Sequence, residues 1–356
     1  MELFIWYHKS MLHKIKNKID KELGRFVFRI NKLYSLSYIS PLLYNTIKEF
    51  VLRKGKRIRP ILFVVGYLGF AKRKAKNLYT SALSLELLHD FMLIHDDIID
   101  NSDLRRGKPS THKMLDDHLG NYKNIKFSGK DLAIVLGDVM YAIAIDAFLS
   151  IQEKPQHKEE ALKRFIQAAI YTGSGEFIEL LSGIKSLEKI TKQDIYKIYD
   201  YKTAYYTFSS PLATGAILAG AKKTEVEKLS RYGIFLGRAF QIKDDILGIF
   251  GDEKKTGKSA FTDLQEAKKT LLIWYAYKHS SKKDKYRINK TLPKQKISSY
   301  DLEGIRKIIC KTGTLDYVIK EVGRLIKRSK KLLESSKIKP RYKNFLFSYA
   351  EKILTL

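Results

Sequence analysis

The chain has 356 residues, of which 44% are hydrophobic, and this is enough to bury the core of one large domain. Its formal net charge is +29, from 67 lysines and arginines against 38 acidic residues. The lysines are spread along the whole chain, which argues against a nucleic-acid partner, because such proteins usually concentrate charge on one face. Lysines spread in this way most simply form a solvated surface, and a peripheral attraction of the surplus to anionic lipid headgroups is the alternative reading.

Cysteine usage and hydropathy indicate the compartment. The only cysteine, Cys310, excludes an internal disulfide and fits a reducing, cytoplasmic environment. The longest apolar runs are 61–70 and 132–149, and the second is interrupted by Asp138 and Asp146. Neither run offers about 20 uninterrupted apolar residues, so we expect no membrane-spanning segment.

The first predicted elements are a long amphipathic helix over residues 8–35 and a basic loop at 51–60 that leads into an apolar helix. Pro60 suits the first turn of that helix. A basic loop that contains Gly55 and precedes a helix can bind an anion, but it can also be an ordinary solvent-exposed loop. The sequence of this segment alone leaves both readings open.

The next predicted helix, over residues 77–100, ends in a cluster of three carboxylates. Asp96 and Asp100 are four positions apart and therefore share one helical face, with Asp97 beside them. Three carboxylates this close repel one another unless a cation lies between them. They offer only oxygen ligands, which suit a hard cation such as Mg²⁺.

A polar loop at 101–110 follows this helix and contains Arg105 and Arg106. These arginines could neutralise the aspartates, or they could bind a phosphate through two parallel hydrogen bonds. Residues 113–130 are predicted to form an irregular connection.

The second half of the chain is also predicted to be helical, without any alternating strand pattern. A second acidic pair, Asp244 and Asp245, lies in a predicted apolar helix over 225–250. Residues 251–262 are predicted to form a mobile flap, and 280–299 a basic connection. The other predicted helices cover 131–150, 158–183, 205–221, 264–279 and 300–356. We therefore expect an all-α fold, a single domain over residues 1–356 with ten or more helices around a central cavity.

Two acidic patches facing each other across a cavity with a basic rim would suit one kind of chemistry. Carboxylates bind a diphosphate only through bridging Mg²⁺ ions. Such ions also neutralise a departing diphosphate and so allow a C–O bond to ionise. An apolar pocket would exclude water from the resulting carbocation.

At this point the sequence resembles the trans-isoprenyl diphosphate synthases over roughly residues 50–320. The resemblance is closest to the archaeal-type geranylgeranyl diphosphate synthases. Six motifs occur in the family's order: Gly-Lys-Arg-Ile-Arg-Pro at 55–60, Glu-Leu-Leu-His at 86–89, Asp-Asp-Ile-Ile-Asp at 96–100 with Arg-Arg-Gly-Lys-Pro-Ser-Thr at 105–111, Lys-Thr at 202–203, Phe-Gln-Ile-Lys-Asp-Asp at 240–245, and Gly-Lys, Asp-Leu and Lys-Lys-Thr within 257–270.

The resemblance implies head-to-tail condensation of isopentenyl diphosphate with an allylic diphosphate, namely dimethylallyl, geranyl or farnesyl diphosphate. It implies that Asp96, Asp100 and Asp244 bind three Mg²⁺ ions, with Mn²⁺ as an alternative, and that Asp97 and Asp245 support them. The departing diphosphate would serve as the general base. The family is dimeric, so a homodimer is expected.

The resemblance also assigns the two substrates to different residues. Lys202, Thr203 and Gln241 would stabilise the cation and act as the catalytic residues. The allylic diphosphate would be bound by Arg105, Lys202, Thr203, Gln241, Lys258 and Lys268. Isopentenyl diphosphate would be bound by Lys56, Arg59, His89 and Arg106.

Product length should depend on the side chain below the first aspartate. The residue five positions before Asp96 lies roughly 7–8 Å deeper along the helix. This residue is Phe91, with Met92 above it. An aromatic residue at this position resembles the archaeal-type geranylgeranyl synthases and favours a C20 product. Phe91 could instead be ordinary core packing, in which case a farnesyl or longer product is the alternative.

One departure from the family pattern, and two other classes of protein, must be weighed against this interpretation. Gly248 stands where many members have a third aspartate, a form that geranylgeranyl-type members often show. A class I terpene cyclase would also ionise a diphosphate with carboxylate-bound metal ions, but it would not need the basic motif at 55–60. A non-catalytic subunit of a hetero-oligomeric synthase would usually lack aspartates of the first motif, whereas this chain has all three.

Overall fold

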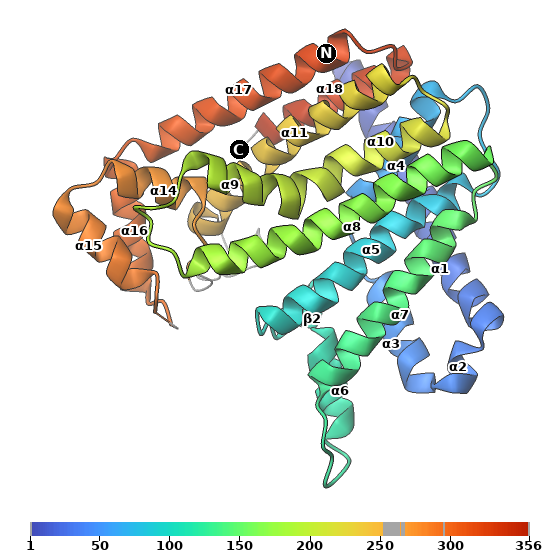
Figure 1. Ribbon diagram of the computed structural model, residues 1–356, viewed down its shortest axis with the longest axis horizontal. Helices are drawn as coiled ribbons and strands as arrows, with labels where there is room; N and C mark the ends of the chain where they lie inside the picture. Colours follow the sequence, from blue (N-terminus) through green and yellow to red (C-terminus); the bar gives the residue numbers. More distant parts are fainter. Residues whose placement is uncertain (1, 252–263, 265–267, 295, 355–356) are drawn as a thin grey trace. The chain divides into compact units, whose positions relative to one another are not determined.

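The computed structural model describes residues 2–251, 264, 268–294 and 296–354, and these residues are almost entirely helical (Figure 1). The chain divides into two compact units. Unit 1 comprises residues 1–165 and 214–221, and unit 2 comprises 166–213 and 222–356. The predicted all-α class is therefore confirmed, while the single domain over 1–356 stays a prediction.

Unit 1 is built around α5 (Leu78–Ile99), which packs along α7 (Gly129–Leu149) and against α4 (Ile58–Phe70). The first half of α5 is buried on every side, as expected of a core helix whose apolar residues face all directions. Its last turn reaches the surface, where Asp96 and Asp100 are partly exposed while Asp97 stays buried. The remaining helices are α1 (Glu2–Tyr34), α2 (Leu36–Ile39), α3 (Pro41–Leu52) and α6 (Thr111–Leu119).

Unit 2 is built around α11 (Lys223–Phe250), which packs against η1 (Tyr199–Ser209) and α17 (Thr314–Glu334). The η1 segment is a π-helix. The other helices wholly within this unit are α9 (Lys192–Ile198), α14 (Leu271–Lys278), α15 (Lys282–Thr291), α16 (Ser299–Lys311) and α18 (Pro340–Leu354). Two helices, α8 (Pro155–Gly183) and α10 (Ser210–Leu218), contribute residues to both units.

Glycines allow α11 to approach η1 closely. A Cβ atom on Gly237 would lie 2.5 Å from the Cα atom of Ala204, closer than two carbon atoms can approach. The two helices are further joined by Arg238 of α11. Its Nε donates to Asp200 Oδ1 on η1 at 2.6 Å, and its Nη2 donates to Asp200 Oδ2 at 2.5 Å. This bidentate contact helps set the orientation of α11 along η1.

Several predicted boundaries were wrong. Residues 113–130 are not irregular throughout, because α6 occupies Thr111–Leu119 and buries Leu115 and Leu119 one turn apart. The basic connection at 280–299 contains α15, whose N-cap Ser281 accepts from the Asp284 amide. The loop at 101–110 contains a small antiparallel hairpin, β1 (Leu104–Arg105) and β2 (Lys108–Pro109). The predicted flap at 252–262 lies outside the described residues.

One described helix, α7, is long and apolar enough to cross a membrane by length and composition. In its most apolar window 44% of the residues are buried inside the protein. The helix packs against α5 and α6, so its apolar character is that of a core helix with one open side.

Candidate active site

The carboxylates at the end of α5 occupy different environments. Asp97 is fully buried and accepts a hydrogen bond from Arg105 Nε at 2.7 Å. The side chain of Asp96 is 26% exposed and lies 3.4 Å from Arg105 Nη2. Burial raises the pKa of Asp97, although Arg105 opposes this shift. Asp97 therefore anchors the arginine, whereas Asp96 keeps an accessible oxygen.

The hairpin presents Arg105 and Arg106 beside this helix. Arg106 and Gly107, the two central residues of its turn, both have positive φ, at 55° and 74°. Such two-residue turns match the twist of the flanking strands. Arg53, the C-cap residue of α3, donates to the carbonyl oxygens of Arg105 at 3.0 Å and Pro109 at 2.9 Å. The hairpin is thereby fixed to the helical core.

Three of the residues predicted to bind isopentenyl diphosphate gather in unit 1. Desolvation, followed by the charges of Arg59 and Arg106, holds the pKa of His89 well below its usual value. His89 is therefore neutral at pH 7, and it lies among cations that suit a diphosphate. Lys56, in the loop just before α4, has an exposed side chain, and Arg59 lies in the first turn of that helix.

The predicted chain-length residue Phe91 lies in an aromatic cluster between α5 and α7. Its ring centroid is 4.7 Å from that of His95 and 5.3 Å from that of Tyr141. Phe91 and Met92 are both half-buried. Phe91 is thus positioned by neighbours on both helices, one turn and a half before Asp96.

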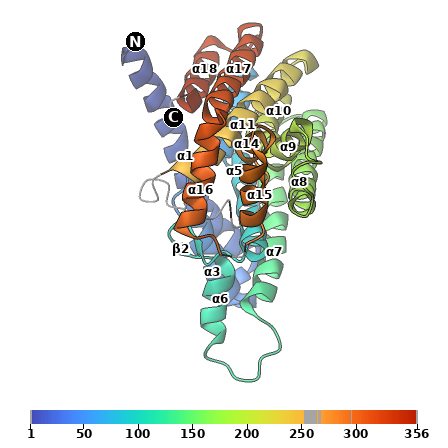
Figure 2. The ribbon, with the colours of Figure 1, turned by 90° about the vertical axis from the view of Figure 1, so that its left-hand side faces the viewer.

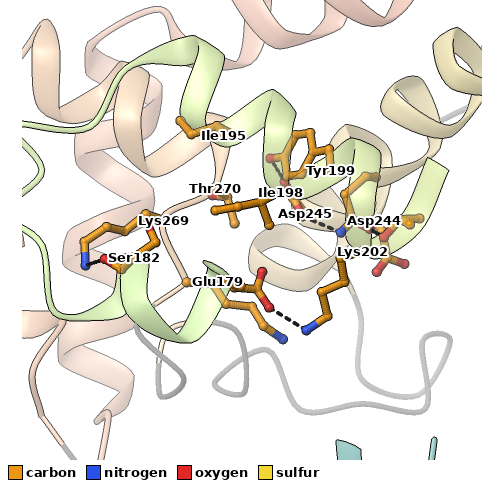
Figure 3. A pocket seen from close by; sticks show the side chains of 13 residues that line it. Glu179, Ser182, Ile195, Ile198, Tyr199, Lys202, Asp244, Asp245, Lys269 and Thr270 are labelled. Atoms are coloured by element: carbon orange, nitrogen blue, oxygen red, sulfur yellow. Dashed lines mark hydrogen bonds and ion pairs between the residues drawn. The ribbon is translucent and has the colours of Figure 1, made fainter. Parts of the chain in front are cut away.

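Unit 2 contains a pocket between α8, η1 and α11 (Figure 3). The predicted residues Lys202, Thr203, Gln241, Asp244, Asp245 and Lys268 all line it. Its other lining residues are Glu179, Ser182, Ile195, Ile198, Tyr199, Lys269 and Thr270. Cations, carboxylates and apolar side chains therefore meet in one concave site.

A chain of hydrogen bonds orders the polar side of this pocket. Thr203 Oγ1 donates to Gln241 Oε1 at 2.8 Å, and Gln241 Nε2 donates to Asp245 Oδ1 at 2.9 Å. Tyr199 donates to the other oxygen of Asp245 and accepts from the Leu271 amide at 2.8 Å. Burial and the nearby Asp245 raise the pKa of Tyr199 well above its usual value, so its hydroxyl stays a donor.

Lys202 lies between two carboxylates of α8. Its Nζ is 2.7 Å from Glu176 Oε2. It also donates to Glu179 (Figure 3). The close approach of α8 to η1 requires Gly175, because a Cβ atom there would lie 2.4 Å from the Lys202 amide nitrogen. Lys269 donates to the carbonyl oxygens of Ser182 and Gly183 at the end of α8.

The structure adds site residues that the sequence reasoning missed. Tyr199, Glu176 and Glu179 were not predicted, although each contacts a predicted residue. Tyr199 lies three residues before Lys202 on η1, and Glu179 lies on α8, which α9 separates from η1 along the chain. Their contacts with the pocket are visible only in the fold. Lys258 lies outside the described residues.

The carboxylate oxygens at the end of α5 and on α11 are ligands that suit a hard cation. Asp96 and Asp244 keep accessible carboxylate oxygens, and Asp100 ends α5 beside Asp96. Among the described residues, no group of three or more His, Cys, Asp or Glu side chains is arranged to hold a metal ion. A cavity with two facing acidic patches stays a prediction, since Asp96 belongs to unit 1 and Asp244 to unit 2.

Comparison with known proteins accounts for this combination of residues. The polyprenyl synthetase family model matches residues 40–309. The chain belongs to the polyprenyl synthetase family. Its match to a short chain isoprenyl diphosphate synthase of Methanocaldococcus jannaschii is 31% identical and covers 83% of this chain and 81% of that protein.

Two further proteins are similar to this chain. A geranylgeranyl diphosphate synthase of Saccharolobus solfataricus is 34% identical over 72% of this chain and 73% of its own length. The crystal structure of a geranylgeranyl pyrophosphate synthase from Corynebacterium glutamicum, complexed with isoprenyl diphosphate and magnesium, matches with a TM-score of 0.87. It is 28% identical and covers 97% of this chain and 99% of its own. The predicted family, fold and prenyltransferase class are thereby confirmed.

Proposed function

We propose that this polyprenyl synthetase condenses isopentenyl diphosphate with allylic diphosphates and releases geranylgeranyl diphosphate, a C20 product. The observation that supports this proposal best is the unit 2 pocket, where Lys202, Thr203, Gln241 and Asp244 line one site. The relatives named above, which make short-chain and geranylgeranyl products, support the same activity.

In the proposed reaction the allylic diphosphate binds at the unit 2 pocket and at Arg105. Asp96, Asp100 and Asp244 would bind Mg²⁺, which neutralises the departing diphosphate when bound. The Thr203 hydroxyl and the Gln241 amide present fixed dipoles, which stabilise positive charge without reorganising. Lys202 contributes a cation whose position is set by Glu176 and Glu179. Lys268 lines the same pocket and adds positive charge.

Isopentenyl diphosphate is proposed to bind at Lys56, Arg59, His89 and Arg106. The neutral His89 donates a hydrogen bond without adding charge, while the arginines offer paired N–H groups that match phosphate oxygens. Cleavage of the C–O bond of the allylic substrate gives a carbocation and diphosphate. The double bond of isopentenyl diphosphate attacks the carbocation, and the released diphosphate then takes a proton from the condensed cation.

Phe91 supports the C20 assignment. Its ring packs against His95 and Tyr141 and therefore has little freedom to move aside for a growing chain. A farnesyl or longer product is the alternative if another residue closes the pocket.

The function is tested by incubating the purified protein with Mg²⁺, radiolabelled isopentenyl diphosphate and each allylic primer. The expected result is incorporation into a C20 prenyl diphosphate that EDTA abolishes. Absence of incorporation with every allylic primer would contradict the proposal.

We further propose a cytoplasmic homodimer. On α7, the side chains of Ile134, Val135 and Leu149 are exposed by 43%, 60% and 46%, and this apolar side suits a second copy of the chain. Light scattering should then give twice the mass of 41.2 kDa. Val135→Asp should shift the protein toward the monomer, whereas the polar change Lys163→Asp on exposed α8 should not.

A further inference from the structure

Two arginines of unit 1 have a backbone conformation that arginine seldom adopts. Arg57 has a φ of 53° and Arg106 a φ of 55°, both in the left-handed region. The other described non-glycine residues with positive φ are three asparagines and one serine, whose short polar side chains favour this region. A left-handed residue costs about 1–2 kcal/mol, so the surroundings must stabilise both arginines.

One pair of buried carboxylates contacts both arginines. Glu86 and Asp90 are four positions apart on one face of α5. Glu86 Oε1 accepts from Arg57 Nη1 at 2.7 Å, and Asp90 Oδ1 accepts from Arg106 Nη2 at 3.1 Å. Arg106 Nη2 also lies 3.8 Å from Glu86 Oε1. One turn of α5 thereby joins the loop before α4 to the turn of the hairpin.

Arg57 itself is fully engaged by the protein. Its Nε donates to Asp20 at 2.9 Å and its Nη2 donates to the carbonyl oxygen of Arg53 at 2.7 Å. Only 3% of the residue is exposed, so it cannot serve as an anion ligand. It instead fixes the loop that carries Lys56 and leads to Arg59 in the first turn of α4.

The carboxylate pair also depends on the arginines. Burial, followed by the neighbouring Glu86, raises the pKa of Asp90 to about 7, and Arg106 and Arg57 limit the shift. Asp90 contacts Arg106 through a single hydrogen bond, and Arg106 Nη1 makes none with the described residues. Besides this bond, the Arg106 guanidinium lies over the ring of Phe50, 5.9 Å from its centroid.

We propose that Glu86 and Asp90 are positioning residues for isopentenyl diphosphate. The pair fixes Arg57 and Arg106, and with them two segments distant in sequence, so that cations from both segments meet one diphosphate. This inference rests on the proposed function, because it assumes that Lys56, Arg59 and Arg106 bind that substrate.

The test uses Glu86→Gln and Asp90→Asn, which keep the side-chain shape and remove the charge. We expect the KM for isopentenyl diphosphate to rise about tenfold in each, with the KM for farnesyl diphosphate within twofold and kcat within threefold. Amide hydrogen exchange should become faster over 51–57 in Glu86→Gln and over 103–109 in Asp90→Asn. The matched control is Glu22→Gln, a part-buried carboxylate bonded to Thr80 at 2.6 Å, which should change none of these values.

Two results would overturn the inference: an unchanged KM with only a lower melting temperature, or equal rises in the KM of both substrates. If Glu86→Gln does not fold, Asp90→Asn decides, because the amide oxygen of asparagine can still accept the single hydrogen bond from Arg106. If the wild-type protein incorporates no isopentenyl diphosphate, the proposed function fails. Amide hydrogen exchange then tests separately whether Glu86 and Asp90 fix the two segments. Faster exchange in the variants supports this role, and unchanged exchange contradicts it.

Discussion

Neighbouring carboxylates on α5 have different tasks because each residue turns about 100° around a helix. Asp97 points into the protein and is fully buried against Arg105, while Asp96 is 26% exposed. The same division recurs in unit 2, where Asp245 is buried against Tyr199 and Asp244 is exposed. In both pairs, one member is buried against a neighbouring side chain and the other is more exposed.

This division predicts how single aspartates respond to substitution. Asp96→Ala and Asp244→Ala should each lower kcat by at least about a hundredfold, because they remove proposed metal ligands. The melting temperature should stay within a few degrees of the wild-type value. Asp117→Ala, an exposed aspartate on α6, is the control and should keep full turnover. A variant that unfolds would instead assign these aspartates a structural role.

Phe91 makes the product length testable. Phe91→Ala removes an aromatic ring packed against His95 and Tyr141, and it should therefore lengthen the product beyond C20. Chromatography of the dephosphorylated products measures the chain length. Phe28→Ala, which truncates a ring that is 61% exposed on α1, should leave the product unchanged. An unaltered distribution in Phe91→Ala would remove it as the limiting residue.

At the scale of whole elements, η1 determines the geometry of the unit 2 pocket. A π-helix has a wider turn than an α-helix, and such segments are frequent at functional sites. It places Tyr199, Lys202 and Thr203 along the pocket, each bonded to a different partner on α8 or α11. Residues Gly175 and Gly237 allow those two helices to approach closely enough for these bonds to form.

The connection between α9 and α17 should make stability depend on pH. Burial opposes ionisation of Glu321, but Arg324, Tyr196 and Lys192 outweigh it and lower its pKa to about 2. A lowered pKa stabilises the fold above the unfolded value near 4.5, and this contribution is lost as the pH falls toward about 2.

Glu321→Gln should therefore reduce the free energy of unfolding at pH 7 by about 2 kcal/mol, a value reduced for solvent screening. The variant should also lose part of the dependence of stability on pH below 4.5. Urea unfolding at several pH values measures both effects. Parallel pH curves for the variant and the wild type would show that Glu321 is not responsible.

At the scale of the whole molecule, the net charge of +29 acts together with a few exposed apolar side chains. The connection between α6 and α7 lies at the lower end of Figures 1 and 2, beyond the helices of unit 1. It exposes Tyr122, Ile125 and Phe127 by 58%, 42% and 49%, with Lys123 and Lys126 between them. Aromatic and lysine side chains in alternation suit the surface of an anionic bilayer.

We therefore expect the protein to sediment with vesicles containing phosphatidylserine and not with vesicles of phosphatidylcholine alone. Because the attraction is electrostatic, binding should weaken as salt rises from 0.05 to about 0.5 M. The change Tyr122→Ser with Phe127→Ser should reduce binding several-fold without altering prenyl transfer. Equal binding to both kinds of vesicle would contradict this expectation.

The sequence alone determined the all-α class and the family, because helical periodicity and the spacing of charged motifs are local properties. The hairpin at 104–109 and the helix α6 could not be predicted with equal success. Their short segments depend on contacts such as those of Arg53 with the hairpin carbonyl oxygens, 52 and 56 residues away in sequence.

Tertiary structure decided which member of each charged cluster is buried. The sequence shows Arg57 and Arg59 as equivalent cations, yet Glu86 and Asp20 engage Arg57 completely. Likewise, nothing local to Asp90 indicates that it contacts Arg106 or that burial raises its pKa to about 7. Burial and long-range pairing are properties of the folded chain, and they separate the residues that position a site from those that can bind its ligands.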